Sequence, residues 1–126
     1  MGVIRVKRIY DAAADEDGMR ILVDRIWPRG VSRAVARIDQ WPKETAPSHE
    51  LRRWFSHESE RWTEFKRRYF SELDRSPDAW APLIQECRNG TVTLLYAASD
   101  RSQNNAVALC EYLSANLGLR AESKGS

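Results

Sequence analysis

The sequence has few cysteines and no long hydrophobic run. Its two cysteines, Cys87 and Cys110, do not form a C-x-x-C pair, which excludes a disulfide framework and favours a reducing cytoplasm. No apolar run approaches the roughly 20 residues that a membrane-spanning helix needs. The charged N-terminal residues predict no signal peptide. We therefore expect a cytoplasmic protein that does not bind a membrane.

The short motifs of common catalytic and cofactor sites are also absent. The sequence contains no P-loop, no G-x-G-x-x-G and no G-x-S-x-G. Its two histidines, His49 and His57, are eight residues apart and far from either cysteine, which is not the spacing of zinc ligands. We predict no metal and no cofactor. Whether the protein is an enzyme stays open.

The net charge is small, and lysine is scarce. Twenty Lys and Arg against 18 Asp and Glu leave a formal charge of +2, which argues against attachment to nucleic acid by bulk charge. Sixteen of the 20 cations are Arg, whose planar fork suits carboxylates and phosphates. Five tryptophans lie in the middle of the chain, in a stretch that is also dense in Arg: Trp27, Trp41, Trp54, Trp62 and Trp80.

Hydrophobic periodicity predicts strands separated by helices. Strands are expected at 3–9, 20–26 and 91–96, with a short edge strand at 119–121; helices are expected from 48, at 59–73, from 76 to 89, and at 102–117. This order favours an α/β fold with a small, largely parallel sheet flanked by helices, as in a Rossmann-like layered sandwich. We expect one domain over residues 1–122 and a frayed tail at 123–126.

The first candidate site follows the strand at 20–26, because ligands of such sheets bind beyond the carboxyl ends of the strands. Arg25 and Arg29 are predicted to hold an anion there, with Trp27 as a stacking wall. Asp24 is a candidate general base. The alternative is structural: Asp24 and Arg25 form ion pairs and Trp27 fills the core.

The second candidate site follows the last predicted strand and runs into the head of the final helix. Tyr96, Asn104 and Asn105 are predicted to orient a ligand through hydrogen bonds. Asp100 is the second candidate base. The alternative is that Ser99 or Asp100 only caps the helix.

A segment between these two exits adds three candidates. Lys43 and Ser48 are predicted to face the same crevice, and Trp41 is a second candidate stacking wall. The alternative for this segment is a loop that proline stiffens and Trp41 pins, and for Trp41 itself this interpretation is the better one.

These candidates predict a site for a small anionic or nucleotide-like ligand at the C-terminal ends of the strands, with catalysis undecided. One alternative is a nucleic-acid-binding module in which Arg contacts phosphates and Trp stacks on bases. Helical core spacing of Trp54, Trp62 and Trp80 counts against it. The other alternative is a non-catalytic interaction or accessory protein. The sequence indicates no oligomeric state.

Taken together, the motifs resemble the YeaO-like family of bacterial proteins, a family of unknown function. The resemblance covers about Ile4 to Leu117 and is carried by Asp24-Arg25-Ile26-Trp27-Pro28-Arg29-Gly30, Ala46-Pro47-Ser48, Leu51-Arg52-Arg53-Trp54-Phe55, Leu94-Leu95-Tyr96-Ala97-Ala98 and Asn104-Asn105-Ala106. It implies a compact α/β domain in the bacterial cytosol but supplies no function, because the family has no established activity. Ser56-His57-Glu58-Ser59 departs from the expected Gly-His-Asp-Pro, a change that we expect to alter a helix cap rather than a site.

Overall fold

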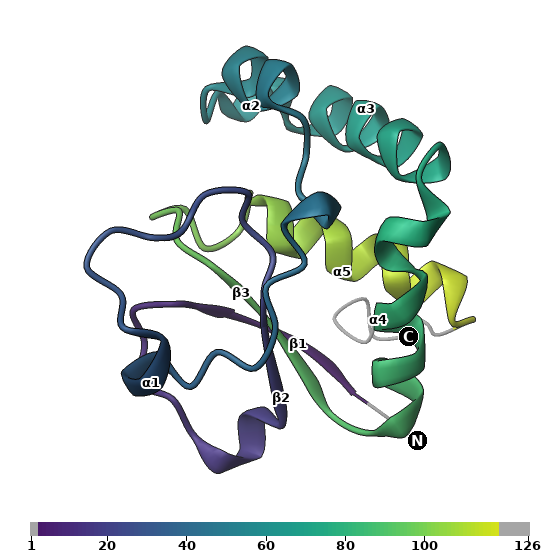
Figure 1. The fold of residues 1–126 in the computed structure, drawn as a ribbon. Coiled ribbons are helices and arrows are strands. Elements are labelled where there is room, and N and C mark those ends of the chain that lie inside the picture. The colour runs from purple at the N-terminus through teal and green to yellow at the C-terminus, as the bar shows by residue number, and fades with distance from the viewer. Residues whose placement is uncertain (1–2, 119–126) are drawn as a thin grey trace.

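A three-stranded sheet lies at the centre of the structure, which is a computed structural model and describes residues 3–118. Strands β1 (Ile4–Arg8), β2 (Met19–Leu22) and β3 (Val92–Tyr96) are parallel and stand in the order β1-β3-β2. The most apolar strand, β3, is therefore central and is buried along its whole length. The arrangement confirms the predicted small parallel sheet flanked by helices (Figure 1).

The helices α2, α3 and α5 lie on one side of the molecule and α1 lies on the other (Figure 1). The bounds are α1 (Arg33–Ala36), α2 (His49–Phe55), α3 (Trp62–Asp74), α4 (Pro77–Asn89) and α5 (Asn105–Asn116), with 3₁₀ turns at Asp15–Asp17, Lys43–Thr45 and Ser59–Arg61. The buried stripe of α3 is the predicted one, because Phe65, Tyr69 and Leu73 face inward. Their spacing puts them on one side of a helix with 3.6 residues per turn.

The two faces of the sheet carry separate cores, because successive side chains of a strand point to opposite faces. Leu94 belongs to a large cluster with residues of α2, α3, α4 and α5. Its neighbour Leu95 belongs to a small cluster with Leu22, Ile9 and Ile38, against which Trp27 and other residues of the segment 27–41 pack. We call these the helix face and the loop face.

The loop face also buries an ion cluster. Asp17, of which 4% is exposed, accepts hydrogen bonds from Arg20 at 2.5 Å and from Lys7 at 3.1 Å. Arg20 is 2% exposed and also donates from Nε to the carbonyl of Ala36 at 2.8 Å. Next to it, Gly18 has φ +65°, and a Cβ there would lie 2.3 Å from the carbonyl oxygen of Thr91. The Asp17-Gly18 turn thus needs glycine.

Two predicted boundaries are wrong. The strand expected at 20–26 ends at Leu22, because the carboxylate of Asp24, rather than a strand carbonyl, accepts the N–H of Ala97. The last helix begins at Asn105 rather than at Ser102, and Asn104 is its N-cap. The edge strand expected at 119–121 and the tail at 123–126 lie outside the described residues.

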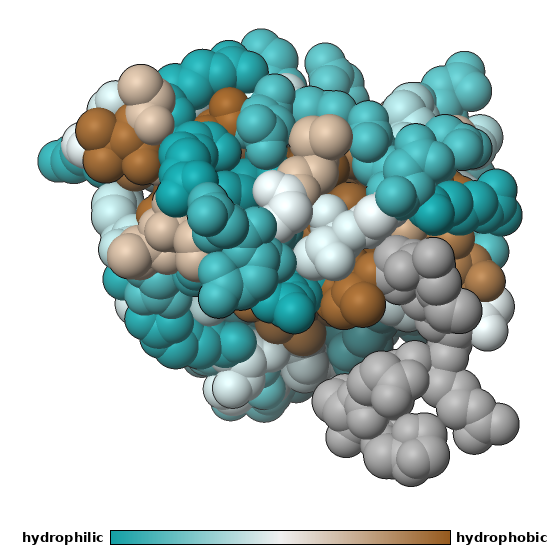
Figure 2. All heavy atoms as spheres, turned by 90° about the horizontal axis from the view of Figure 1, so that it is seen from below, coloured by the Kyte–Doolittle hydropathy of each residue, from teal (hydrophilic) through white to brown (hydrophobic). Residues whose placement is uncertain are grey.

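Large hydrophobic side chains that remain exposed are scattered: Val3, Tyr10, Ile26 and Val35. The side seen from below is mostly hydrophilic, with hydrophobic residues in small patches (Figure 2). Within residues 3–118, no helix has the length and apolar character needed to cross a membrane.

Candidate functional site

A cavity of about 350 Å³ opens at the carboxyl ends of β2 and β3, between α2 and the start of α5. Asp24, Arg25 and Ile26 line it from the end of β2, and Ala98, Asn104 and Asn105 line it from beyond β3. The rest of the lining is contributed by Ala46, Pro47, His49, Arg52, Arg53, Phe55, His57 and Phe65. Both predicted strand exits therefore contribute to one cavity, at the edge where parallel sheets bind ligands.

Asp24 is a carboxylate held at the floor of this cavity. Its Oδ2 accepts the N–H of Ala97 at 3.0 Å, and its Oδ1 accepts the side-chain N–H of Asn105 at 3.1 Å. Burial raises the pKa of Asp24 above its ordinary value, and the two hydrogen bonds and the charge of Arg52 offset only part of that effect. The ionised form of Asp24 therefore has too few hydrogen bonds and nearby positive charges to offset its burial.

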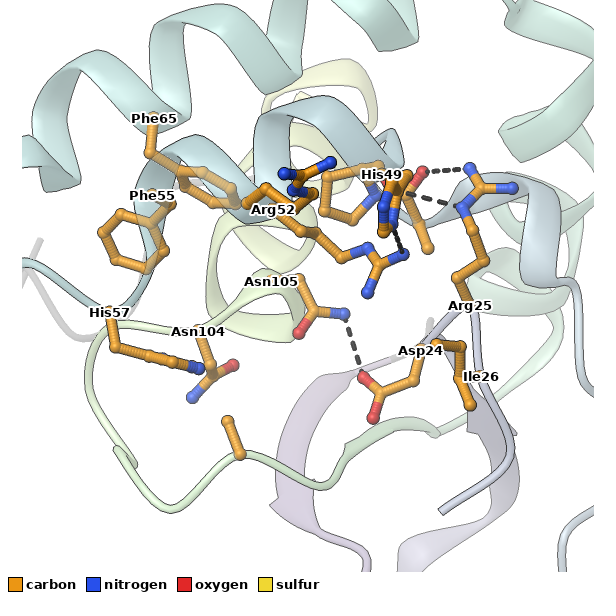
Figure 3. Close-up of a pocket in the computed structure, with 14 residues that line it drawn as sticks. Asp24, Arg25, Ile26, His49, Arg52, Phe55, His57, Phe65, Asn104 and Asn105 are labelled. Carbon is orange, nitrogen blue, oxygen red and sulfur yellow. Dashed lines mark hydrogen bonds between the residues drawn. The ribbon is translucent and has the colours of Figure 1, made fainter.

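Arg52 faces Asp24 from the opposite wall (Figure 3). Its Nε is buried and has no hydrogen-bond partner among the described residues. Its Nη2 lies 3.3 Å from Nδ1 of His49. Among the ion pairs found in residues 3–118, none joins Arg52 to Asp24. The two opposite charges thus face each other across open space.

Local sequence on α2 explains why its cations face the cavity. Ser48 caps the helix by accepting the N–H of Leu51 at 3.1 Å. Leu51 and Phe55, four residues apart, are buried in the helix-face core. His49, Arg52 and Arg53 recur at the i, i+3 and i+4 positions, so all three lie on one adjacent stripe that lines the cavity.

A strained turn after α2 places His57 at the cavity. Ser56 has φ +45° and His57 has φ +58°, both in the left-handed region that L-residues avoid. The His57 ring packs against Phe55, with ring centroids 5.9 Å apart. Backbone strain of this kind gathers at ligand sites, and here it holds an imidazole at the cavity wall.

Of the predicted site residues, four line the cavity: Asp24, Arg25, Asn104 and Asn105. The guanidinium of Arg25 donates to the carbonyls of Ala46 at 2.9 Å and Pro47 at 3.3 Å, so it also fixes the loop before α2. Asn104 is 2% exposed, and its side chain accepts the N–H of Val107 as a helix cap.

The predicted stacking walls lie on the loop face instead. Trp27 and Trp41 pack edge to face with ring centroids 5.2 Å apart, and Lys43 lies 5.3 Å from the Trp41 ring. The indole N–H groups donate to the carbonyls of Val31 and Asp24. Neither tryptophan lines the cavity, and neither does Lys43 or the exposed Arg29.

Three further predicted residues also lie outside the cavity lining. Ser48 donates from its Oγ to Glu72 at 2.6 Å. Tyr96 is 2% exposed and belongs to the core. Asp100 is exposed, and the N–H groups of Gln103 and Ser102 lower its pKa by hydrogen bonding to its carboxylate. Asp24 and Asp100 therefore do not share this cavity.

Sequence reasoning missed Arg52, Arg53, His49 and His57 as site residues. The spacing of the two histidines excludes only a zinc site, and the two arginines carry only the resemblance to the family. For His49, Arg52 and Arg53 the available signal was their spacing, which puts them on one helix stripe beside the buried Leu51 and Phe55, whereas His57 lies in the turn after α2. In the part of the chain that the structure describes, no group of three or more His, Cys, Asp or Glu side chains is placed to hold a metal ion.

Comparison with known proteins places the chain in a family. Residues 3–126 match the family model DUF488-N3i, described as the Inactive DUF488-N3 subclade. The chain belongs to this family. "Uncharacterized protein YeaO" of Escherichia coli (strain K12) is 40% identical over 110 residues, which is 87% of this chain and 96% of the relative. "Uncharacterized protein Mb3100c" of Mycobacterium bovis is also 40% identical over 110 residues, 87% of this chain and 92% of the relative. No solved structure matches the chain significantly.

These findings confirm the resemblance to the YeaO-like family, and the structure explains the departure at Ser56. Ser56 is the residue after the last turn of α2, and its conformation is left-handed. Glycine adopts this conformation without cost, whereas serine does not. The substitution therefore affects the cap of α2, as expected.

Proposed function

We propose that the protein binds a small anionic ligand in the cavity between α2 and α5 and does not transform it. The observation that carries the proposal is the half-buried Arg52 in the cavity wall, which forms no ion pair within the described residues. A guanidinium without a carboxylate partner is available to an anionic ligand.

The charge of the cavity supports an anion. Three arginines line it against a single carboxylate, that of Asp24. Arg52 and Arg53 are adjacent on α2, and a guanidinium binds carboxylate or phosphate through two parallel hydrogen bonds. The volume of about 350 Å³ lies at the lower end of the roughly 300–1,000 Å³ typical of small-molecule sites.

One observation supports binding without catalysis. The family is described as an inactive subclade. The nucleic-acid alternative gains no such support, because all five tryptophans are half-buried rather than exposed for stacking on bases.

The test is a titration with inorganic phosphate, followed by NMR at constant ionic strength. We expect saturable binding that Arg52→Gln weakens by roughly 10- to 100-fold, because a hydrogen bond to a charged group contributes about 1.5–3 kcal/mol. Arg53→Gln, at an exposed residue of the same wall, should weaken binding less.

Arg29→Gln is the matched control, since Arg29 is an exposed arginine outside the cavity. Its phosphate affinity should stay within about twofold of the wild type. Non-saturable binding, or an equal loss of phosphate affinity in Arg29→Gln and Arg52→Gln, would overturn the proposal. Either result would show that phosphate associates non-specifically with positively charged residues.

A further inference from the structure

An anion without hydrogen-bond donors could contact Arg52 but would leave Asp24, on the opposite side of the cavity, without a ligand partner. We infer that the ligand is a phosphate ester that carries hydroxyl groups, the chemistry shared by sugar phosphates and mononucleotides. Its phosphate would lie at Arg52, and its hydroxyls would donate to Asp24. This inference rests on the proposed function and adds the class of the ligand.

The first support is the unpaired arrangement of Arg52 and Asp24. The two half-buried side chains face each other (Figure 3) but form no ion pair within the described residues. The fold holds them apart from two different elements, α2 and the end of β2. A ligand that bridges them must offer an acceptor at one end and a donor at the other.

The second support concerns the donor, which should be neutral. Each oxygen of Asp24 already accepts one N–H, from Asn105 or Ala97, and a carboxylate oxygen can accept a second hydrogen bond. An ammonium group would enter a cavity lined by three arginines and one carboxylate, where the net charge repels it. Hydroxyl groups fill the remaining acceptor sites without that repulsion.

The third support concerns the anion. Arg52, Arg53, His49 and His57 all contribute to the lining of the cavity. A carboxylate has two oxygens for these donors, whereas a phosphate ester has three free oxygens and more charge. The number of nitrogen donors therefore favours phosphate over carboxylate.

The experiment compares two ligands with the same three-carbon chain, n-propyl phosphate and glycerol 3-phosphate, which adds two hydroxyls. On the wild-type protein, glycerol 3-phosphate should bind roughly tenfold more tightly, since hydrogen bonds to a charged acceptor contribute about 1.5–3 kcal/mol. In Asp24→Asn the difference should disappear, while n-propyl phosphate binds no more weakly than before because a negative charge has been removed.

Equal affinities of the two ligands for the wild-type protein would overturn this inference. The proposed function would still stand if both ligands bound and Arg52→Gln weakened both, and it would fall too if neither bound. The ligand pair needs no variant, so the inference is tested even if Asp24→Asn does not fold. Ribose 5-phosphate and adenosine 5′-monophosphate form a second pair, which tests whether a base adds to the affinity. Equal affinity would mean that the base contributes nothing, so that the ligand is a free sugar phosphate. Tighter binding of the monophosphate would identify the ligand as a nucleotide.

Discussion

The helix face and the loop face of the sheet use similar residue types for different purposes. On the loop face, Trp27 and Trp41 cover a small core and their indole N–H groups bond to the backbone. On the helix face, Arg52 reaches into a cavity with its Nε unsatisfied by any described residue. The sheet thus divides a cluster of Trp and Arg in the sequence between a packed structural half and the half that lines the proposed site.

The same contrast separates two aspartates. Asp17 on the loop face is bonded to both Arg20 and Lys7 at 3.1 Å or less. Asp24 at the cavity faces Arg52 without an ion pair within the described residues. The paired carboxylate of Asp17 stabilises the fold, although Nη2 of Arg20 has no partner among the described residues, whereas the unpaired Asp24 and Arg52 are the groups that we propose bind a ligand.

The largest effect is expected when the ion cluster on the loop face is broken. Asp17→Asn leaves Arg20, which is 2% exposed, without its carboxylate partner. Removing one partner of a buried pair costs about 3–5 kcal/mol, because the other charge stays buried. Urea unfolding should show this loss. Asp15→Asn, which removes an exposed carboxylate from Arg37, is the control and should change nothing measurable; an equally small effect of Asp17→Asn would contradict the contrast.

A pair of core substitutions compares the packing of the two faces. Leu94 and Leu95 are adjacent, fully buried and on the central strand, but they point to opposite faces. Leu94→Ala and Leu95→Ala should each cost about 2–5 kcal/mol of unfolding free energy. We expect the larger cost for Leu94, because helices surround it and relax less than the loops around Leu95. Chemical denaturation measures both, and a larger cost for Leu95 would show that the loop face is the more rigid one.

A smaller effect, of opposite sign, is expected at the left-handed turn beside the cavity. Ser56→Gly should stabilise the protein by up to about 1 kcal/mol, because φ +45° is strained for serine and not for glycine. Arg37→Gly, at φ +52° on the loop face, is the matched change. Thermal unfolding would show both gains, and a loss in Ser56→Gly would mean that the bond from its Oγ to the carbonyl of Arg53 outweighs the strain.

The subtlest effect is the opposite titration of the two aspartates. Burial opposes ionisation of Asp17, but hydrogen bonds from Ala14, Lys7 and Arg20 outweigh it and lower its pKa. Its contribution to stability is therefore complete above the unfolded value of about 3.9 and is lost as the pH falls through the folded pKa. Burial raises the pKa of Asp24, so its contribution is present below about 3.9 and is lost as the pH rises through the folded pKa. NMR titration of the carboxyl groups should give Asp17 a pKa below the ordinary value and Asp24 a pKa above it. The reverse order would contradict the difference in electrostatic environment between the two aspartates.

Much of the fold could be predicted because its signals are local. The apolar run that became β3, the Ser48 cap and the stripe of Phe65, Tyr69 and Leu73 each depend on residues within one or two turns. The ends of β2 and α5 were missed because they depend on distant partners. The carboxylate of Asp24 accepts a backbone N–H from residue 97, and Asp100 holds the N–H groups of residues 102 and 103 in a turn before α5.

The candidate site was predicted only in part for the same reason. That both strand exits meet follows from parallel topology alone, so Asp24, Arg25, Asn104 and Asn105 could be placed together. The opposite wall comes from α2, whose position over the sheet depends on how Leu51 and Phe55 pack into the helix-face core. No local pattern shows that Trp27 turns away from the cavity while Arg52 turns toward it.

The most direct test of the account is one NMR spectrum of the wild-type protein with and without inorganic phosphate. The Nε–H signal of Arg52 and the indole N–H signals of Trp27 and Trp41 report the two faces in the same experiment. Phosphate should shift the Arg52 signal saturably and leave both indole signals in place. Shifts of the indole signals with an unmoved Arg52 signal would place binding on the loop face and contradict the proposed site.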